Sequence, residues 1–320
     1  MGNLNLQPAA SSTPKKQVFK RTCCKNETPL KILNINFQSI KNKQQELQEI
    51  LISTKPDIII GTETWLNKDI LSSEFFSMMD YTVYRKDRPP STNNLSYGGV
   101  LVAITTNLLS EEIRDLQTDS ESIWVQINMT NAIKLIVESY YRPPSYNGTS
   151  IEQLKTSLDR INQNAKSTII LGGDFNLGHI NWDIPCTIPS KPDIKLHEQL
   201  LNIINEHSLE QTVKKPTRGD RTLDLILTNI PSIVNKVETM PPIGNADHDI
   251  VYAECALSLK RNKKITRKTN QYKKANWENI KEDVNKLTQD IKGHYHSSST
   301  NDLWKTFTDR LLTSVKKNIP

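Results

Sequence analysis

The run Ile58-Ile59-Ile60-Gly61 contains no polar residue, and it restricts the fold of this chain more than any other feature. A strand with one face in water alternates apolar and polar residues, so a continuous apolar run indicates a strand covered on both faces. Leu30–Phe37 also has a strand pattern, and residues 41–53 between the two runs place apolar side chains at helical spacing. We therefore predict that a strand, a helix and a covered strand open the folded part of the chain.

Further strand patterns outnumber the helical ones. The additional strands are predicted at 81–84, 99–104, 123–127, 134–140, 168–171, 223–227 and 250–256, and the additional helices at 150–163 and 194–207. Two sheets packed face to face, with helices on their outer faces, would bury these runs. We predict an α/β fold, a four-layer α/β sandwich in which two packed mixed β-sheets are flanked by helices.

The distribution of charge divides the chain into four parts. Residues 1–29 are polar and basic and are predicted to be a disordered arm, and residues 30–258 form the sandwich domain. Residues 259–275 form a basic linker, because residues 260–274 include no acidic side chain. Residues 276–320 contain two amphipathic segments, which we interpret as the helical start of a truncated following region. The basic excess favours a polyanionic partner such as nucleic acid.

The sequence has neither an apolar stretch long enough to cross a bilayer nor a signal-peptide pattern at its start. Its four cysteines have no zinc-type spacing, and two of them are adjacent, so neither a zinc site nor a disulfide framework is indicated. We expect a soluble monomer that is neither secreted nor membrane-bound. The compartment stays unassigned, although the basic arm is compatible with the nucleus.

Polar residues follow the predicted strands where each strand ends. They are Asn34 and Asn36, Glu63, Tyr141, Asp174 and Asn176, Asp224, and Asp247 with His248. Phosphate-ester hydrolysis needs carboxylates that hold a cation, a group that activates water, and donors for the phosphate oxygens. If the strand ends converge, this set supplies all three.

These motifs occur in the order seen in the endonuclease/exonuclease/phosphatase superfamily. The chain resembles, within it, the endonuclease of non-LTR (LINE-like) retrotransposons, because Gly173-Asp174-Phe175-Asn176-Leu177 runs on to Ile180-Asn181-Trp182, and Lys215-Pro216-Thr217-Arg218 precedes Thr222-Leu223-Asp224. The resemblance covers roughly residues 30–257 and implies a DNase I-like sandwich.

The resemblance also implies a metal site and an acid–base site. Glu63 is the expected principal Mg²⁺ ligand, assisted by Asn34 and Asn36, with Mn²⁺ as an alternative ion. Asp174 is expected to deprotonate the attacking water or to protonate the leaving oxygen, with Asn176 fixing its geometry.

The remaining candidate residues are expected to contact the phosphate. His248 is expected to do so while oriented by Asp224, whose charge favours the imidazolium. Asp247 either positions metal-bound water or shares the acid–base task, and the sequence does not rank Asp174, Asp247 and His248 for that task. We predict that Tyr141 donates its hydroxyl to a phosphate oxygen and that the adjacent Tyr140 is a core residue.

A basic loop precedes Asp224, at the position where related nucleases carry a hairpin that contacts the DNA groove. Its cations are predicted to bind DNA phosphates; they are Lys214, Lys215, Arg218 and Arg221. An ordinary solvated turn is the alternative. Asn36 stands where the abasic-site repair enzymes have an acid, which favours plain DNA nicking over repair. Trp65 and Trp182 are interpreted as core residues rather than stacking platforms.

The resulting hypothesis is a Mg²⁺-dependent endonuclease that nicks one strand of duplex DNA, as part of a retrotransposon. The 3′-hydroxyl would prime a reverse transcriptase, a partner domain expected outside this chain because no Tyr-x-Asp-Asp signature occurs in it. Two alternatives remain. One is a phosphoesterase of the same fold that acts on an inositol phosphate or a phospholipid, and the other is an inactive remnant that only binds nucleic acid.

Overall fold

The computed structural model describes residues 29–89, 97–129, 133–144, 148–161, 167–257, 259, 261 and 272–320. The predicted arm at 1–29 lies outside these residues except for Pro29, and 11 of the 17 residues of the predicted linker at 259–275 also lie outside them. The chain divides into two compact units, Met1–Asn262 and Lys263–Pro320. The first unit contains two six-stranded sheets and carries the candidate site.

The first sheet has the strand order β13-β14-β1-β2-β4-β3. Its strands are β1 (Leu30–Asn36), β2 (Ile58–Thr62), β3 (Tyr81–Lys86), β4 (Val100–Thr105), β13 (Val234–Met240) and β14 (Ile250–Cys255). Helix α1 (Gln44–Thr54) connects β1 to β2, and these two strands pair in parallel. The other neighbours in this sheet pair antiparallel.

The second sheet has the strand order β11-β12-β8-β7-β6-β5. Its strands are β5 (Ser110–Glu112), β6 (Glu121–Asn128), β7 (Lys134–Tyr141), β8 (Ser167–Asp174), β11 (Glu210–Gln211) and β12 (Asp224–Thr228). Helix α2 (Thr149–Asp159) lies between β7 and β8 in the chain, and those strands are again parallel. Each sheet thus contains one parallel strand pair whose carboxyl ends carry polar residues.

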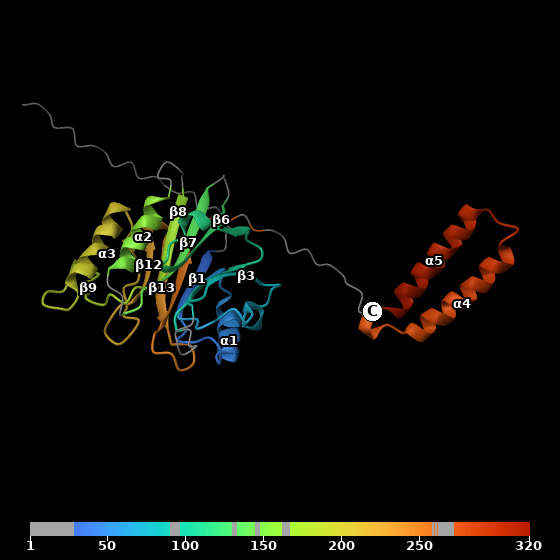
Figure 1. Ribbon diagram of the computed structural model, residues 1–320, viewed down its shortest axis with the longest axis horizontal. Helices are drawn as coiled ribbons and strands as arrows, with labels where there is room; N and C mark the ends of the chain where they lie inside the picture. The colour runs from blue at the N-terminus through green and yellow to red at the C-terminus, as the bar shows by residue number, and fades with distance from the viewer. Residues whose placement is uncertain are drawn as a thin grey trace, which may run out of the picture. The chain divides into compact units, whose positions relative to one another are not determined.

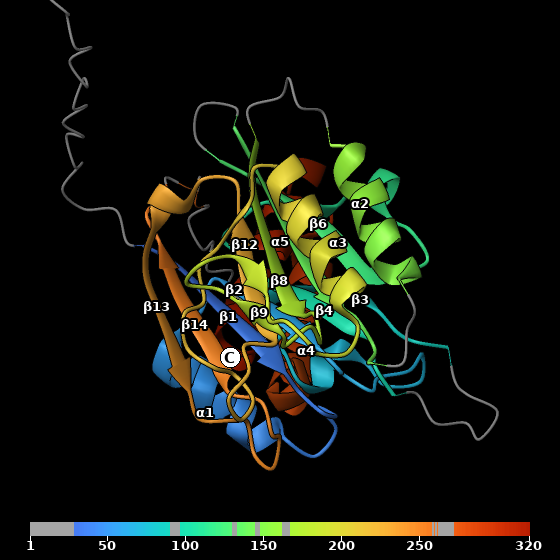
Figure 2. The same cartoon turned by 90° about the vertical axis from the view of Figure 1, so that its left-hand side faces the viewer.

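Helices cover the outer faces of the two sheets (Figures 1 and 2). Helices α2 and α3 (Ile194–Glu206) pack on the second sheet, and α1 packs on the first. The smaller elements are the hairpin β9 (Ile180–Asn181) and β10 (Cys186–Thr187) and the 3₁₀ turns η1 (Ser72–Glu74), η2 (Arg114–Leu116) and η4 (Pro231–Ile233). This arrangement is the predicted four-layer α/β sandwich of two packed mixed sheets.

Three apolar clusters fill the spaces between the layers. The central one joins the facing sides of the two sheets and includes Ile60, Val102, Val137 and Ile170. The other two lie between each sheet and its helices. All five residues of β2 are buried, as the continuous apolar run predicts.

The second unit is a helical hairpin of α4 (Trp277–His294) and α5 (Thr300–Asn318), preceded by the 3₁₀ turn η5 (Tyr272–Lys274). The amphipathic segments predicted at 276–320 are therefore helical. Ile280 and Leu287 are buried between the helices. No helix in the described parts of the chain is long and apolar enough to cross a membrane.

Candidate active site

The polar strand ends of the two sheets meet at one edge of the sandwich. Asp224 begins β12 directly opposite Asp174 at the end of β8, and Tyr141 at the end of β7 is also in register with Asp174. From the first sheet, Asn36 ends β1 beside Thr62, and Glu63 follows it. The parallel pairing of β1 with β2 and of β7 with β8 explains why chain-distant polar residues share this edge.

Asp174 is the centre of the site and is fully buried. One carboxylate oxygen accepts the Asn176 backbone N–H at 3.0 Å, and the other accepts the Asn176 side-chain amide at 2.9 Å. Burial first, and then the charge of Asp224, raises the pKa of the Asp174 carboxyl well above its ordinary value, although the charge of His248 opposes this. Asp174 is therefore better suited than an ordinary carboxyl group to hold or transfer a proton.

The residue before Asp174 must be glycine for steric reasons. Gly173 has φ +137°, and a Cβ atom there would lie 1.9 Å from the carbonyl oxygen of Tyr140. No side chain can be tolerated at that distance without moving the backbone of β7. The Gly-Asp-Phe-Asn motif thus has a local structural cause as well as a chemical one.

Asn36 bridges two carboxylates across the sheet interface. Its Nδ2 donates to Glu63 Oε1 and to Asp174 Oδ2, at 3.0 Å each. Its side-chain oxygen accepts the backbone N–H of Gln38 at 3.1 Å, which fixes the orientation of the amide. Glu63 itself has a left-handed backbone with φ +49°, a strained conformation of the kind found at functional sites.

Asn34 lies two residues before the end of β1 and is fully buried. Its Nδ2 donates to the carbonyl oxygens of Gly173 at 3.4 Å and of Leu225 at 3.1 Å. It therefore links the first sheet to the second beneath the site.

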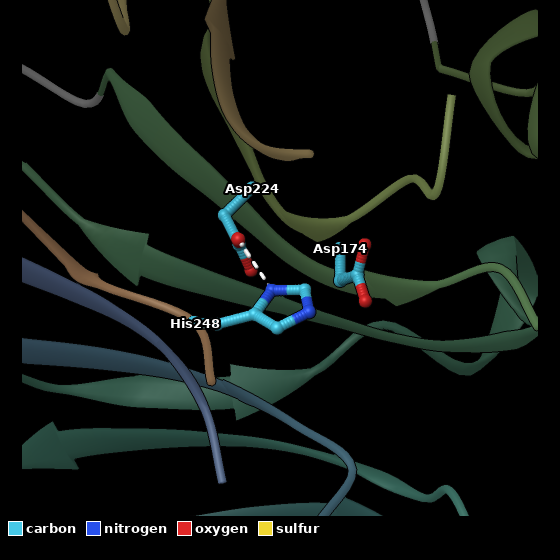
Figure 3. A group of neighbouring side chains, drawn as sticks. All are labelled: Asp174, Asp224 and His248. Carbon is cyan, nitrogen blue, oxygen red and sulfur yellow. Dashed lines mark hydrogen bonds and ion pairs between the residues drawn. The ribbon is translucent and has the colours of Figure 1, made fainter. Parts of the chain in front are cut away.

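His248 and Asp224 form a buried pair (Figure 3). His248 Nδ1 lies 2.7 Å from Asp224 Oδ2, and both side chains are almost completely buried. Burial lowers the pKa of His248, but the hydrogen bond and charge of Asp224, together with Asp174, outweigh it and raise the pKa to about 9. The imidazole is therefore cationic at neutral pH, and its Nε2 makes no protein hydrogen bond among the described residues.

Asp247 lies at the more exposed rim of the same cluster. It is 46% exposed, and its Oδ1 lies 3.8 Å from His248 Nε2. The amide of Gln38 donates to that oxygen and accepts the Asp247 backbone N–H at 3.0 Å. Arg218 forms an ion pair with the other oxygen at 2.5 Å. This arrangement connects the loop after β1, the loop before β14 and the basic loop.

Tyr140 and Tyr141 both pack in the apolar core, but the Tyr141 hydroxyl lies near the carboxylates of Glu63 and Asp174. The Tyr140 hydroxyl lies 2.8 Å from Ser150 Oγ beneath α2. Burial, followed by the charges of Glu63 and Asp174, raises the pKa of the Tyr141 hydroxyl, so it stays protonated and can donate. The guanidinium of Arg88 lies 5.5 Å from the centre of the Tyr141 ring.

The basic loop is a tight hairpin with a buried anchor. Thr217 and Arg218 both donate backbone N–H groups to the carbonyl of Arg221. The buried Thr217 hydroxyl accepts the N–H groups of Leu223 at 3.0 Å and Asp224 at 3.1 Å. Because the Asp249 N–H also donates to the Thr217 carbonyl, Thr217 joins the hairpin to the start of β12 and to the loop that carries His248.

A cavity of about 510 Å³ adjoins the acid cluster. Its walls include Asn176 from the site, Arg218 and Arg221 from the hairpin, and the buried Arg142. The other two predicted phosphate-binding cations, Lys214 and Lys215, come shortly before Arg218 in the sequence, and both are exposed. The positive side chains make this rim suitable for a polyanion.

The side chains at this edge fit a divalent cation. Within the described residues, Asp174, Asp224 and His248 form a buried group whose potential ligand atoms all lie within 4.8 Å of one another. Glu63 joins them through Asn36. The side-chain oxygens Asn34 Oδ1 and Asp224 Oδ1 are buried and accept no hydrogen bond from any residue that the structure describes. The cationic His248 already compensates the charge of Asp224, so the oxygens of Asp174 and Glu63, which Asn36 joins, are the ones that suit a hard cation.

Sequence reasoning missed three residues that organise the site. Gln38 holds Asp247, Thr217 holds the start of β12, and Lys43 is a buried lysine whose Nζ donates to the carbonyls of Phe37 and Gln38. All three act through loop contacts that apolar periodicity does not reveal. Their proximity to Asn36 and Asp224 in the sequence was the available signal.

Three comparisons place this geometry among known proteins. A family model described as "Endonuclease-reverse transcriptase" matches residues 135–252. A probable RNA-directed DNA polymerase from transposon BS of Drosophila melanogaster is 30% identical over 161 residues, which is 50% of this chain and 17% of that protein. The chain thus spans under a fifth of that relative.

Solved structures share the fold. The endonuclease domain of TRAS1, a telomere-specific non-LTR retrotransposon, is 19% identical with a TM-score of 0.54, over 73% of this chain and 100% of that one. The AP endonuclease LMAP from Leishmania major is 13% identical with a TM-score of 0.56, over 71% and 87% of the two chains. The fold is therefore DNase I-like. The predicted resemblance to the endonuclease/exonuclease/phosphatase superfamily, and to its retrotransposon members, is confirmed.

Proposed function

We propose that this chain is a divalent-metal-dependent endonuclease that hydrolyses DNA phosphodiester bonds and nicks one strand of a duplex. The observation that carries the proposal is the buried Asp174, Asp224 and His248 cluster, joined to Glu63 through Asn36 beside a basic rim. The retrotransposon resemblance supports DNA as the substrate. The AP endonucleases share the fold, but the uncharged Asn36 at the site favours nicking of undamaged DNA.

Glu63 is the proposed principal ligand of Mg²⁺ or Mn²⁺, with Asn34 and Asn36 completing its surroundings. The Asn36 oxygen already accepts the Gln38 N–H, so Asn36 acts here by holding Glu63 and Asp174 together. A bound divalent ion would supply electrostatic stabilisation of the charge that develops on the phosphate oxygens.

Asp174 and Asn176 form the proposed acid–base pair. The raised pKa of Asp174 lets it take a proton from the attacking water or return one to the leaving 3′-oxygen. Asn176 donates to both oxygens of that carboxylate and so fixes its direction. Asp247 remains an alternative partner in this task because it lies at the rim beside His248.

His248 and Tyr141 are the proposed donors to the scissile phosphate. The cationic His248 presents its Nε2 without a hydrogen bond among the described residues, with the Asp247 carboxylate 3.8 Å away, while Asp224 holds Nδ1. The protonated hydroxyl of Tyr141 is a second donor from the opposite side of Asp174. Donors placed in advance stabilise the extra charge of an in-line attack by water.

The basic hairpin and its rim are proposed to hold the DNA backbone through Lys214, Lys215, Arg218 and Arg221. Phosphate contacts of this kind position a duplex without reading its sequence. The relative from Drosophila melanogaster is named a probable RNA-directed DNA polymerase, so we further propose that the 3′-hydroxyl at the nick primes a reverse transcriptase.

Plasmid nicking tests the substrate choice. Supercoiled plasmid is incubated with the protein and Mg²⁺, and parallel reactions contain an inositol phosphate or sphingomyelin. We expect conversion of the plasmid to nicked circles and no turnover of the soluble ester or the lipid. Ester turnover without nicking would replace the endonuclease assignment by a phosphoesterase, and binding of DNA without either reaction would indicate an inactive remnant.

A further inference from the structure

A polar bridge formed by Gln38, Asp247 and Arg218 lies beside the proposed phosphate donor His248. Asp247 Oδ2 pairs with the guanidinium of Arg218, while Asp247 Oδ1 accepts the side-chain N–H of Gln38. The same Oδ1 lies 3.8 Å from His248 Nε2. Gln38 follows β1 of the first sheet, and Arg218 belongs to the hairpin before β12 of the second. The bridge therefore joins the two sheets at the site.

The Gln38 side of the bridge is held in place. Its amide oxygen accepts the Asp247 backbone N–H at 3.0 Å while its amide nitrogen donates to the Asp247 carboxylate, so both polar atoms bind one residue. Gln38 and Ser39 have left-handed backbones, with φ +40° and +76°. The buried Lys43 donates to the carbonyls of Phe37 and Gln38. Strained backbone persists where the surroundings impose it, so the loop keeps Asp247 where it is.

The Arg218 side of the bridge is fixed by its backbone and not by packing of its side chain. The Arg218 N–H donates to the Arg221 carbonyl and the Arg221 N–H donates back, both at 3.0 Å. The Arg218 side chain is 46% exposed, as is that of Asp247. It also lines the cavity of about 510 Å³ that Asn176 borders. Because an exposed ion pair contributes little free energy, the guanidinium can turn from Asp247 into this cavity at small cost.

A phosphate bound to His248 would change the balance of charge beside it. A phosphate oxygen that accepts a hydrogen bond from His248 Nε2 would lie near Asp247 Oδ1, and the two anions would repel each other. Arg218 is a cation near both groups. Burial first, and then the charge of Arg218, lowers the pKa of His248, although Asp224 outweighs them. A guanidinium that acts on the His248 ring is close enough to meet a phosphate bound there.

We propose that Arg218 exchanges partners when DNA binds, leaving Asp247 for a backbone phosphate at the site, and that Asp247 opposes binding until this exchange takes place. This inference rests on the proposed function. Gln38 keeps the Asp247 carboxylate in place, so the exchange needs the movement of one side chain only. Binding then loses the ion pair between Arg218 and Asp247 and gains an ion pair between Arg218 and the phosphate.

The exchange has a signature in the salt dependence of binding. Each phosphate that a protein cation neutralises releases counterions, so the slope of log affinity against log salt concentration reports the number of such contacts. Arg218 in the wild type is already neutralised by Asp247, and its transfer adds little to this slope. In Asp247→Asn the guanidinium is free before binding, and we expect the slope to become steeper by about one.

Equilibrium binding of a fluorescent DNA duplex at several salt concentrations tests the exchange. The full chain is compared with Arg218→Ala, Asp247→Asn and the double variant, in EDTA so that no metal-dependent cleavage occurs. We expect Asp247→Asn to bind about threefold more tightly than the wild type, the weight of one exposed ion pair. Arg218→Ala should weaken binding about threefold more in the Asp247→Asn background than in the wild type, because only there does Arg218 give up no earlier partner.

Asp220→Asn is the matched control. It removes a carboxylate from the same hairpin, where Asp220 is 97% exposed and lies 3.8 Å from Arg221. If loss of negative charge alone tightened binding, this variant would gain as much affinity as Asp247→Asn; the exchange predicts a smaller gain and an unchanged salt slope. Arg218→Gln repeats the comparison with a polar side chain, and matching thermal unfolding midpoints establish that the variants are folded.

Two results would overturn the exchange. One is an equal loss from Arg218→Ala in both backgrounds, which would mean that Arg218 and Asp247 act independently. The other is a smaller loss in the Asp247→Asn background, which would mean that Arg218 only shields Asp247 and does not contact DNA. If either result accompanies plasmid nicking by the wild type, the exchange alone fails. If the wild type neither binds nor nicks DNA, the proposed function fails as well.

Discussion

Replacing Asp224 by Asn removes the charge that keeps His248 protonated while retaining a hydrogen-bond acceptor for Nδ1. The pKa of His248 is raised from its ordinary value of 6.5 to about 9. That difference corresponds to roughly 3 kcal/mol in favour of the imidazolium. Burial opposes this charge, so without the Asp224 carboxylate we expect the pKa of His248 to fall to 6.5 or below.

The expected effect on activity follows from the protonated fraction. At pH 8 about nine tenths of the wild-type imidazole is cationic, against about 3% for a pKa of 6.5, so nicking should fall about 30-fold. In the wild type, nicking should decline as pH rises through about 9. In Asp224→Asn the same decline should occur near or below pH 6.5. Plasmid nicking rates over this pH range and a titration of the His248 ring by NMR measure both quantities.

The same pair makes a pH-dependent contribution to stability. Because the folded-state pKa of His248 is raised, the contribution is fully present below pH 6.5 and is lost as pH rises through about 9. Asp224→Asn should remove this dependence from the free energy of unfolding. Asp220→Asn is a matched control, because it removes a 97% exposed carboxylate from the neighbouring hairpin. A wild-type pH–rate profile in Asp224→Asn would refute the reasoning.

Three further predictions concern other parts of the site. Asn36→Ala removes the amide that donates to both Glu63 and Asp174. We expect the rate of plasmid nicking to fall at least tenfold, while the DNA affinity, measured by fluorescence anisotropy, stays within about threefold of the wild type. Gly173→Ala should lower the free energy of unfolding by about 3 kcal/mol or more, because the new Cβ atom would meet the backbone of β7. Gly219→Ala should lower it by only about 1 kcal/mol, because Gly219 has φ +59° but open space around it. Denaturant unfolding measures both values. Lys215→Ala should lower plasmid affinity equally for unrelated sequences; a sequence-dependent loss would contradict a phosphate contact.

The sequence was sufficient to predict the central strands and the edge at which their polar ends meet. Ile58–Gly61 is apolar throughout because β2 is covered by the second sheet on one face and by the α1 layer on the other. The edge strand β13 was not predicted, since its exposed and half-buried residues show no apolar run. Its strand conformation depends on pairing with β14, which no local pattern encodes.

The residues of the candidate site also fall into two groups, those that the sequence could predict and those that it could not. The residues at strand ends could be named because their position follows from the strands themselves. The depth of Asn34 could not be read from its spacing, because its amide bonds to carbonyls of the other sheet. Gln38 and Thr217 act from loops whose paths depend on tertiary contacts. Trp65, predicted to be a core residue, is partly exposed for the same reason, whereas Trp182 is buried as predicted. Periodicity reports burial along one element and not the meeting of two loops.

The central claim is that Asp174 carries out the proton transfer of a metal-dependent cleavage of DNA. The most direct measurement compares conversion of supercoiled plasmid to nicked circles by the wild type and by Asp174→Asn, with Mg²⁺ and with EDTA, alongside DNA affinity. The account predicts nicking by the wild type with Mg²⁺ alone, and none by Asp174→Asn despite an affinity near that of the wild type. Full nicking by purified, folded Asp174→Asn, or undiminished wild-type nicking in EDTA, would contradict it.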